Sequence, residues 1–282
     1  MRPIESPHNP HLRRLRALHT RKGRQEQGRF LLEGLLLAEE ALAAGLKPEE
    51  AFLCPALLGG EKTERALAAL SAETDTWQLP EALFRLAADT TTPQGIILVA
   101  PRREQPLSAL DVPAEAPVLA AWEVRDPGNL GTMIRTAHAA GAAAVVTVGE
   151  ATDPFAGKVA RSSMGSLFRV PLAHAARAEE FTSWAAASGL AVAALTAQGG
   201  SAHYDVTYPP RTAFVVGNEV RGLPSELREG AWREITIPMP GGAESLNAAV
   251  SAAVVLFEFA RQSALRHRAE AASAVTGDEG EE

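Results

Sequence analysis

The chain has 282 residues, 46% hydrophobic and 22% charged, so it can bury one large or two smaller cores without disulfides. Its single cysteine, Cys54, excludes an internal disulfide framework and is expected to be a small buried hydrophobe near a strand end. The net charge of −7 argues against a protein that simply coats nucleic acid, and the apolar runs are too short for a signal core or a membrane span, so we expect a soluble, cytoplasmic protein without a membrane partner.

Positive charge is concentrated at the N-terminus. Residues 1–30 contain eight Arg or Lys and two Glu, a net charge of +6 that leaves −13 on the rest of the chain. A basic arm on an acidic body can bind phosphate groups, and it can equally be a solvated helix face with a flexible start. The charge pattern alone leaves both interpretations open.

In the first 105 residues, short apolar runs alternate with helical patterns, which predicts a small α/β domain at residues 1–105. We expect strands at 30–33, 51–54, 76–79 and 96–100, and helices at 34–44, 61–70 and 81–88. Residues 101–117 contain four prolines with charges between them. We therefore expect residues 106–117 to be an interdomain linker.

From Val118 onward the pattern is typical of βαβ units and predicts a second α/β domain with a parallel sheet at residues 118–265. Strands are expected at 118–122, 145–148, 191–196, 214–216 and 235–237, and helices at 130–140, 177–188 and 245–261. The last helix carries apolar residues at helical spacing, namely Leu246, Val250, Val254 and Phe257. Residues 266–282 are polar and end in four acidic side chains, which predicts a disordered tail.

Three segments that follow predicted strands of the second domain are candidates for one composite site, because open α/β sheets bind ligands beyond the carboxyl ends of their strands. The first, Asp126–Arg135, is a glycine-rich turn that enters a helix whose N-terminal amides can hold an anion. Asn129 is a candidate cap of that helix, and Arg135 lies inside it. An ordinary strand–turn–helix joint with an exposed arginine would have the same sequence.

The first segment also invites comparison with a dinucleotide-binding fingerprint. Glu150 lies at the end of the next predicted strand, about where a ribose-binding acid is expected. The glycine spacing is Gly128-x-x-Gly131, however, and not Gly-x-Gly-x-x-Gly. We therefore disfavour a nicotinamide-dependent dehydrogenase.

The second segment, Gly217–Pro224, has glycines that allow tight turns and close approach of a ligand. Glu219 is either a polar anchor in this loop or a solvated glutamate. The third segment, Ile237–Asn247, is a Pro/Gly-rich loop that leads into a helix. For Ser245 and Asn247, helix capping is the favoured role, and contact with a ligand is the alternative.

Taken together, Asn129 and Arg135, the stretch Gly217-Asn218-Glu219 with Gly222-Leu223, and Ile237-Pro238-Met239 followed by Ser245-Leu246-Asn247 resemble, in order and separation, three signature motifs. These are the motifs of the SpoU (TrmH-like) family of SPOUT RNA 2'-O-ribose methyltransferases, and the resemblance spans about Val118–Gln262. The stretch Arg161–Ser166 is also similar to a family sequence. Phe30–Gly34, after the basic arm, resembles the small RNA substrate-binding domain that precedes the catalytic part in many members.

The resemblance implies an α/β fold in which the C-terminal SPOUT domain has a parallel sheet and a deep trefoil knot, preceded by a small α/β RNA-binding domain. Periodicity and composition would argue against a knot, since true knots are nearly absent among folds. It further implies a homodimer that transfers the methyl group of S-adenosyl-L-methionine to a ribose 2'-hydroxyl of RNA. Ribosomal RNA, 23S in particular, is favoured over tRNA because the additional N-terminal domain is common in members that act on rRNA.

Carried over position by position, the resemblance assigns catalytic roles to Asn129, Arg135, Glu219, Ser245 and Asn247, and cofactor binding to Leu195, Gly217, Ile237 and Leu246. Arg135 has been regarded as the base in this family, but an arginine side chain stays protonated in proteins. We therefore expect Arg135 to bind an adjacent phosphate and stabilise the forming alkoxide. Asn129 would orient Arg135 or the ribose, and Glu219 would brace the site.

Two other classes of function are weighed against this interpretation. A non-catalytic RNA-binding protein of the same fold is the main alternative, and it differs from an enzyme in cofactor binding and turnover. A dehydrogenase is the other alternative, which titration with S-adenosylhomocysteine and NAD would distinguish. The histidines are scattered along the chain, so we expect no metal site.

Overall fold

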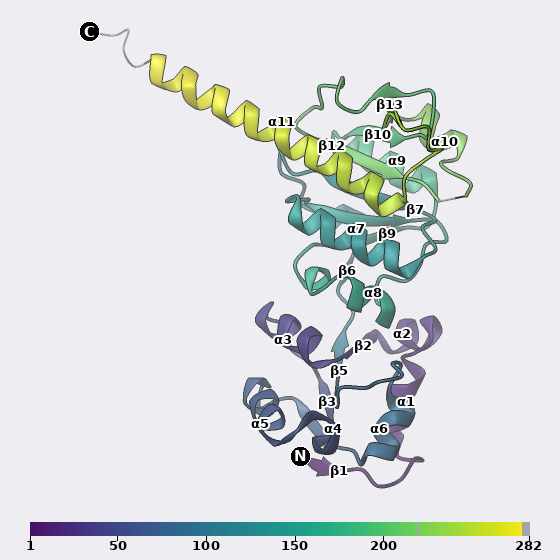
Figure 1. Ribbon diagram of the computed structural model, residues 1–282, viewed down its shortest axis with the longest axis vertical. Helices are drawn as coiled ribbons and strands as arrows, with labels where there is room; N and C mark the ends of the chain where they lie inside the picture. The colour runs from purple at the N-terminus through teal and green to yellow at the C-terminus, as the bar shows by residue number, and fades with distance from the viewer. Residues whose placement is uncertain (219, 278–282) are drawn as a thin grey trace. The chain divides into compact units, whose positions relative to one another are not determined.

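The computed structural model describes residues 1–218 and 220–277, with side chains up to residue 270 (Figure 1). Its contacts divide the chain into two compact units. Unit 1 comprises Met1–Arg103 and Thr152–Arg169, and unit 2 comprises Glu104–Ala151 and the chain from Val170 onward. The stretch Thr152–Arg169 therefore packs with the N-terminal residues, although the sequence boundaries place it inside the second domain.

The proline-rich stretch 106–117 is packed into unit 2 and is not an open linker. Leu107 lies in the short 3₁₀ helix η1 (Leu107–Ala109), and both Leu107 and Val112 belong to the core of unit 2. The prolines led to the expectation of a linker, but the two apolar side chains between them favour burial. Cys54 is buried directly after a strand, as expected.

Unit 1 contains a five-stranded mixed sheet in the order β1-β4-β3-β5-β2. Its strands are β1 (Arg2–Pro3), β2 (Arg29–Glu33), β3 (Glu50–Leu53), β4 (Asp75–Gln78) and β5 (Ile96–Pro101). Its helices are α1 (Pro10–Ala17), α2 (Arg21–Gln27), α3 (Leu35–Ala43), α4 (Pro55–Leu58), α5 (Gly60–Ala69), α6 (Glu81–Ala87), α8 (Gly157–Ser162) and the 3₁₀ helix η2 (Ser166–Phe168). The expected strands and helices of this half all occur, whereas the two helices of the basic arm and α8 were missed.

The second segment of unit 1 is held by a buried ion pair. Nε of Arg24 donates to Oδ2 of Asp153 at 2.7 Å, and both side chains are almost completely buried. Nη1 of Arg24 also donates to the carbonyl oxygens of Leu18 and His19. The Phe155 ring packs edge-to-face against Phe30 with centroids 5.1 Å apart. Because a buried charge must be paired, this arrangement fixes how the segment is attached.

Unit 2 contains an eight-stranded parallel sheet in the order β11-β13-β10-β12-β7-β8-β9-β6. Its strands are β6 (Glu104–Gln105), β7 (Val118–Trp122), β8 (Ala144–Val148), β9 (Leu172–Ala175), β10 (Ala191–Leu195), β11 (Ser201–Ala202), β12 (Thr212–Val216) and β13 (Arg233–Thr236). Its helices are α7 (Pro127–Ala139), α9 (Ala178–Ala187), α10 (Ser225–Glu229) and α11 (Ala248–Gly277). The parallel sheet predicted for this half is confirmed.

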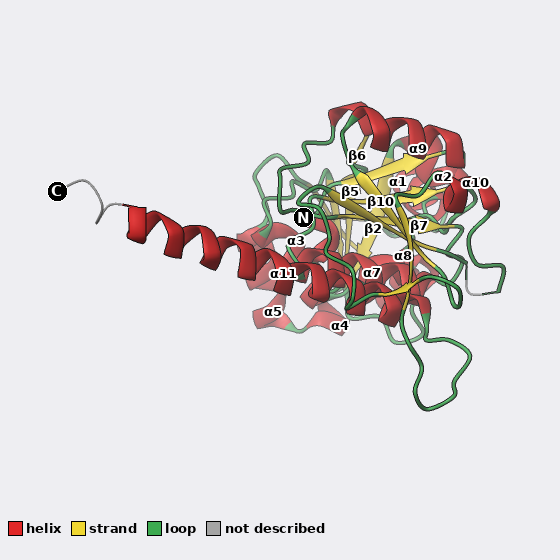
Figure 2. Ribbon diagram, turned by 90° about the horizontal axis from the view of Figure 1, so that it is seen from above, coloured by secondary structure: helices red, strands yellow, loops and turns green. Residues whose placement is uncertain are grey.

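Helices cover both faces of this sheet, as a buried parallel sheet requires (Figure 2). Phe181 of α9 and Leu227 of α10 join a core with Val118 and Val146 on one face. On the other face α11 packs against α7 and β12, and the Phe214 and Phe259 rings meet edge-to-face. Side chains therefore alternate between the two faces along each strand.

Helix α11 differs from the expectation in three ways. It begins at Ala248 instead of Ser245 and continues to Gly277, so residues 266–277 are helical and not disordered. Its buried side chains include Ala252, Val255, Leu256 and Phe259, whereas Val250 and Phe257 of the expected apolar face are exposed. Residues 278–282, which include the four acidic side chains, lie outside the described residues.

The segment Ala248–Glu270 of α11 is long and apolar enough to cross a membrane by composition. Of this apolar window, 39% is buried in the structure, where α11 packs against α7 and β12.

Candidate functional site

A pocket of about 280 Å³ lies beyond the carboxyl ends of the neighbouring strands β10, β12 and β13 in unit 2. This is where an open parallel sheet presents loop backbone to a ligand. Three loops supply its walls, and the lining residues are Leu195, Thr196, Ala197, Val216, Gly217, Asn218, Val220, Arg221, Gly222, Ile237, Met239, Ser245, Leu246, Ala248 and Ser251. The structure thus brings together Leu195, Gly217, Ile237, Ser245 and Leu246, which the sequence motifs had singled out.

The loop after β12 folds back on itself at Gly217. A Cβ atom at this position would lie 2.6 Å from the carbonyl carbon of Gly222 and 2.9 Å from the nitrogen of Leu223. No side chain fits at those distances, so the loop needs glycine for the close approach of its own backbone. Residue 219 lies outside the described residues, so the structure does not place the predicted site residue Glu219.

Asn218 holds this loop against the end of β7. Its Nδ2 donates to the carbonyl oxygen of Glu123 at 2.9 Å, while its Oδ1 accepts from the backbone nitrogens of Val220 and Arg221. Glu123 has a φ of 45°, a backbone conformation that residues other than glycine rarely adopt. Sequence analysis gave Asn218 no role of its own, although its place beside Gly217 is typical of such a turn-stabilising side chain.

The first and third motifs meet through two asparagines. Nδ2 of Asn247 donates to Oδ1 of Asn129 at 2.9 Å. The Oδ1 atom of Asn247 accepts from the backbone nitrogens of Ala249 and Val250, so Asn247 caps α11 as favoured from the sequence. Asn129 does not cap α7. The cap is Asp126, whose Oδ1 accepts from the backbone nitrogen of Asn129 at 2.8 Å.

Arg135 is an exposed residue of α7, six residues after Asn129. Helix geometry separates these two positions by about 9 Å along the axis and about 120° around it. Asn129 therefore lies at the end of α7 where the motifs meet, and Arg135 lies farther along the same helix. Ser245, by contrast, is both exposed and part of the pocket wall.

A second layer of contacts supports the wall formed by Thr196 and Ala197. The loop between β10 and β12 is tied to α11 by Gln262, whose Nε2 donates to Val206 O and whose Oε1 accepts from Tyr208 N. The Tyr208 hydroxyl donates to the carbonyl oxygen of His203, and burial raises the pKa of this phenol. In the part of the chain that the structure describes, no group of three or more His, Cys, Asp or Glu is placed to bind a metal ion.

Comparison with known families decides the assignment. Residues 116–257 match the SpoU rRNA Methylase family, and residues 9–98 match the MRM3-like substrate binding domain. The chain belongs to the SpoU rRNA Methylase family. The first match contains all three motifs of the pocket, and the second lies within the sequence of unit 1.

Relatives of this SpoU chain match it over almost its full length. It is 35% identical to the 23S rRNA (guanosine(2553)-2'-O)-methyltransferase RlmP of Bacillus subtilis, over 91% of this chain and 98% of the relative. It is 30% identical to the 23S rRNA (uridine(2479)-2'-O)-methyltransferase of Streptomyces viridochromogenes, over 87% of each chain.

Solved structures of SpoU relatives have the same fold. An AdoMet-bound rRNA methyltransferase from Sinorhizobium meliloti matches with a TM-score of 0.83 and 34% identity, covering 92% of this chain and 97% of that one. The SpoU methyltransferase AviRb from Streptomyces viridochromogenes, in complex with the cofactor AdoMet, matches with a TM-score of 0.82 and 25% identity, covering 90% and 98%. SpoU enzymes of this fold therefore bind S-adenosylmethionine, called AdoMet below.

The pocket of this SpoU chain fits such a cofactor. Its volume is near the ~300 Å³ lower end for pockets that hold small ligands. Leu195, Ile237 and Leu246 supply apolar walls, and the Gly217 loop supplies accessible backbone groups. The lining also contains Thr196, Arg221 and Met239, to which no binding role was assigned from the sequence, although Met239 lies within the third motif.

Proposed function

We propose that this protein transfers a methyl group from AdoMet to a ribose 2'-hydroxyl of 23S rRNA. The observation that carries the proposal is that the second and third SpoU motifs line one pocket of unit 2, and that the Asn129–Asn247 hydrogen bond joins the first motif to the third. The rRNA substrate is supported by the two relatives named above, which are 23S rRNA 2'-O-methyltransferases, and by the substrate-binding match at residues 9–98. Under this proposal the reaction takes place in the cytoplasm.

When bound, AdoMet supplies an electrophilic methyl group on a sulfonium. The protein then has to hold the acceptor oxygen in line with that methyl group, and positioning of this kind can lower a barrier by about 7–11 kcal/mol. We assign the binding of the cofactor to Leu195, Gly217, Ile237 and Leu246. Asn218 keeps the Gly217 loop in place through its hydrogen bond to Glu123 O.

We assign Arg135 to the RNA side of the reaction. Its guanidinium remains protonated at neutral pH, so it acts as a cation that binds a substrate phosphate and stabilises negative charge on the 2'-oxygen. Asn129 and Asn247 hold the starts of α7 and α11 together and thereby set the position of Arg135 relative to the pocket. Ser245 lines the same pocket and orients the ribose, and Glu219 braces the site.

We further propose that the active form is a homodimer. Val250 and Phe257 lie two turns apart on one face of α11, and Leu246 lies just before this helix; these side chains are 47%, 52% and 37% exposed. A second copy of the chain would bury this apolar stripe. Because Leu246 also lines the pocket, the interface would border the cofactor. Replacing Phe257 with aspartate should yield a monomer by light scattering.

The SPOUT fold of unit 2 further includes, in our proposal, a deep trefoil knot in its C-terminal part. The sheet order supports it, because β13 lies beyond β10 and the chain then returns to pack α11 against β12 and α7. The close backbone passages at Gly200 and Gly217 also fit it. A Cβ atom at Gly200 would lie 2.7 Å from the carbonyl carbon of Ile235.

The test is an in vitro assay with radiolabelled AdoMet and unmodified 23S rRNA, followed by mapping of ribose methylation. We expect one methylated 2'-hydroxyl and binding of S-adenosylhomocysteine but not of NAD. If only tRNA is methylated, the substrate is tRNA and not 23S rRNA. RNA binding without cofactor binding or turnover would indicate a non-catalytic protein and refute the proposal.

A further inference from the structure

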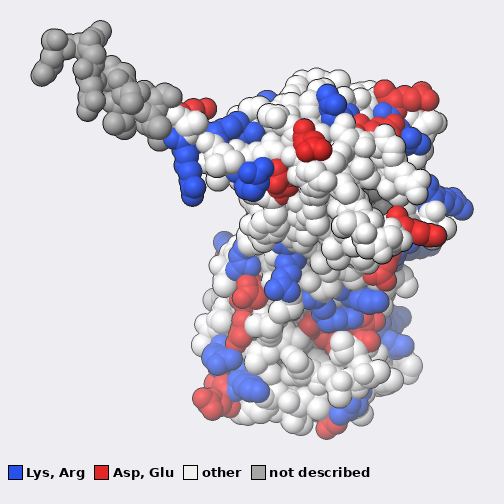
Figure 3. Space-filling model, turned by 45° about the horizontal axis from the view of Figure 1, so that its top comes forward, with Lys and Arg blue, Asp and Glu red and all other residues white. Residues whose placement is uncertain are grey.

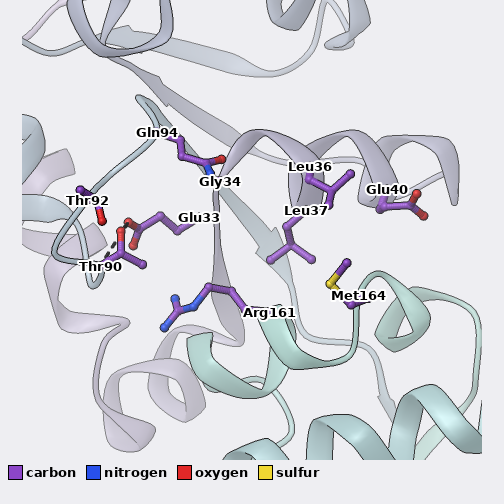
Figure 4. A pocket seen from close by; sticks show the side chains of 10 residues that line it. All are labelled: Glu33, Gly34, Leu36, Leu37, Glu40, Thr90, Thr92, Gln94, Arg161 and Met164. Atoms are coloured by element: carbon purple, nitrogen blue, oxygen red, sulfur yellow. Dashed lines mark hydrogen bonds between the residues drawn. The ribbon is translucent and has the colours of Figure 1, made fainter.

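Unit 1 contains a second pocket, of about 250 Å³, that no motif of the reaction accounts for (Figure 4). It is lined by Glu33, Gly34, Leu36, Leu37, Glu40, Thr90, Thr92, Gln94, Arg161 and Met164. Eight of these ten residues fall within the match to a substrate-binding domain, and the other two come from the segment Thr152–Arg169. The pocket thus joins the Phe30–Gly34 and Arg161–Ser166 stretches, which are 131 residues apart when counted from residue 30 to residue 161.

One wall of this pocket is apolar. Figure 4 shows Leu37 of α3 pointing toward the side of the pocket that holds Met164, which follows α8, with Leu36 beside it on the helix. Leu36 is 55% exposed and Met164 is 47% exposed, so both present carbon or sulfur surface to solvent. A flexible thioether beside two leucines is suited to the face of an aromatic ring. A flat, uncharged ligand that covered this wall would bury its apolar surface, which favours binding.

The opposite wall offers directed hydrogen bonds. The Oε1 atom of Gln94 accepts from the backbone nitrogen of Leu35 at 3.0 Å, which fixes the carboxamide and leaves its NH₂ group for a ligand. Gly34 allows this close approach, since a Cβ atom there would lie 3.2 Å from Oε1. Thr92 adds an exposed hydroxyl in the same loop. Together these groups match the edge of a heterocyclic base.

The charged side chains at this pocket already have hydrogen-bond or ion-pair partners. The carboxylate of Glu33 is buried and accepts from the backbone nitrogens of Asp89 and Thr90. Arg161 pairs with Asp89 at 3.0 Å, and Arg169 pairs with Glu40 at 2.9 Å. A phosphate would therefore meet two carboxylates and no unpaired cation of the lining. The pocket is built for a neutral ligand.

The backbone at Met164 is also unusual, with a φ of 49° in the left-handed region. Such conformations cost energy and persist where the surrounding structure enforces them, often at ligand clamps. Here α8 and the following Gly165, whose φ is 81°, hold the methionine in the mouth of the pocket. The strain keeps an exposed apolar side chain where a partner can cover it.

We propose that this pocket binds one unpaired nucleobase of the RNA substrate, which inserts between Met164 and the leucines of α3 and bonds with the Gln94 amide. The inference rests on the proposed function, since it presumes an RNA substrate. Proteins read single-stranded RNA by accepting splayed bases into pockets and bonding to their edges. The volume of about 250 Å³ leaves room for one base. Unit 1 thus selects the substrate by one of its bases.

The test compares Leu36→Ala with Leu86→Ala. Both leucines are exposed helix residues of unit 1, at 55% and 56%, and only Leu36 lines the pocket. A third variant, Met164→Gly, removes the other face of the clamp and suits a positive φ, so it should fold at least as stably as the wild type. The probe is an unmodified 23S rRNA fragment that the wild-type chain binds, with binding measured by fluorescence anisotropy.

We expect Leu36→Ala and Met164→Gly to raise the RNA dissociation constant about five- to a hundredfold, the range for one base-stacking side chain. Leu86→Ala should bind as the wild type does, and AdoMet affinity should be unchanged in all three variants. A scan of single abasic sites should find one position, separate from the methylated nucleotide, that weakens binding to the wild type but not to Leu36→Ala.

RNA binding by both pocket variants at the level of Leu86→Ala would overturn the inference, and so would an abasic scan without a position that depends on Leu36. Methylation is scored separately on the same RNA. If the wild type methylates ribose and the pocket variants match the control, only the base pocket is wrong. If the wild type binds RNA through the pocket but transfers no methyl group, only the proposed activity is wrong.

Discussion

The two pockets are similar in size but differ in how they are built. The pocket of unit 2 is enclosed by three loops that follow parallel strands, and its lining includes Gly217, where the loop backbone passes too closely for a side chain. The pocket of unit 1 is enclosed by side chains from a helix, a loop and the segment Thr152–Arg169. Backbone walls suit a cofactor that must be held in one bent shape, whereas a side-chain clamp can admit and release a base. We therefore predict that a substitution can weaken ligand binding at one pocket and leave binding at the other unchanged.

The largest effect is expected from Asp153→Ala, which leaves Arg24 buried without its partner. Breaking a buried ion pair in this way costs about 3–5 kcal/mol. Hydrogen exchange, read peptide by peptide, should show the loss in unit 1, and RNA binding should weaken while AdoMet binding persists. Glu81→Ala removes a half-exposed pair with Arg85 and should cost about 1 kcal/mol or less. An equal loss of hydrogen-exchange protection in both units would contradict the prediction that the units lose stability independently.

Next in size is Arg135→Ala. Removal of one group that stabilises developing negative charge lowers turnover about 10²–10³-fold. Single-turnover methylation should fall by this factor, with AdoMet affinity preserved. Arg135→Lys keeps the charge but loses the planar fork, so it should recover only part of the rate. As a control, Arg228→Ala removes an exposed arginine of α10 and should leave the rate unchanged. Full activity of Arg135→Lys would show that the planar guanidinium is not needed and that a positive charge is enough.

A smaller effect is expected from Gly217→Ala. The new methyl group would meet the Gly222 backbone at 2.6 Å, so the loop must shift. We expect AdoMet to bind about tenfold more weakly or worse, which is a loss of about 1.4 kcal/mol. Calorimetry measures this, and RNA affinity should stay at the wild-type value. Gly241→Ala is the matched control, because a Cβ atom there meets nothing within 4 Å.

The smallest effect concerns Glu115 and α11. The ion pair with Arg266 lowers the pKa of the Glu115 carboxyl. Stability from this pair is present above the unfolded-state pKa of about 4.3 and is lost as the pH falls through the folded pKa. Urea denaturation of the wild type and Glu115→Gln should therefore differ by about 1 kcal/mol or less at pH 7 and converge in acid. A difference that grows in acid would contradict the direction of the shift.

The main strands of both units could be predicted from the sequence, because the apolar runs that form them are continuous and bounded by turn residues. The sequence also allowed the prediction of the lining residues Gly217, Ile237 and Leu246, which lie in short motifs, and of Leu195, which the family resemblance assigned by position. It did not reveal that Thr152–Arg169 belongs to unit 1, because the Arg24–Asp153 pair joins residues 129 apart. Tertiary pairs of this kind leave no local pattern.

The capping of α7 and the end of α11 show the same limit. Asp126, Asn129 and Asn247 are all suitable caps by type, and only the hydrogen bonds show which of them serves. The polar composition of residues 266–277 suggested disorder, but one side of the helix is anchored by Arg266 to Glu115 and to Tyr208 O. Local composition does not record such an anchor.

The bond between Asn129 and Asn247 has a consequence for synthesis of the chain. Its two side chains are 118 residues apart, and the Leu246 wall adjoins it. A ribosome that adds about 5–20 residues per second needs several seconds to supply the second asparagine after the first. The nascent protein can therefore complete unit 1 while its catalytic centre is still unfinished. Under the proposed function, each new molecule would be able to bind RNA before it is able to methylate it.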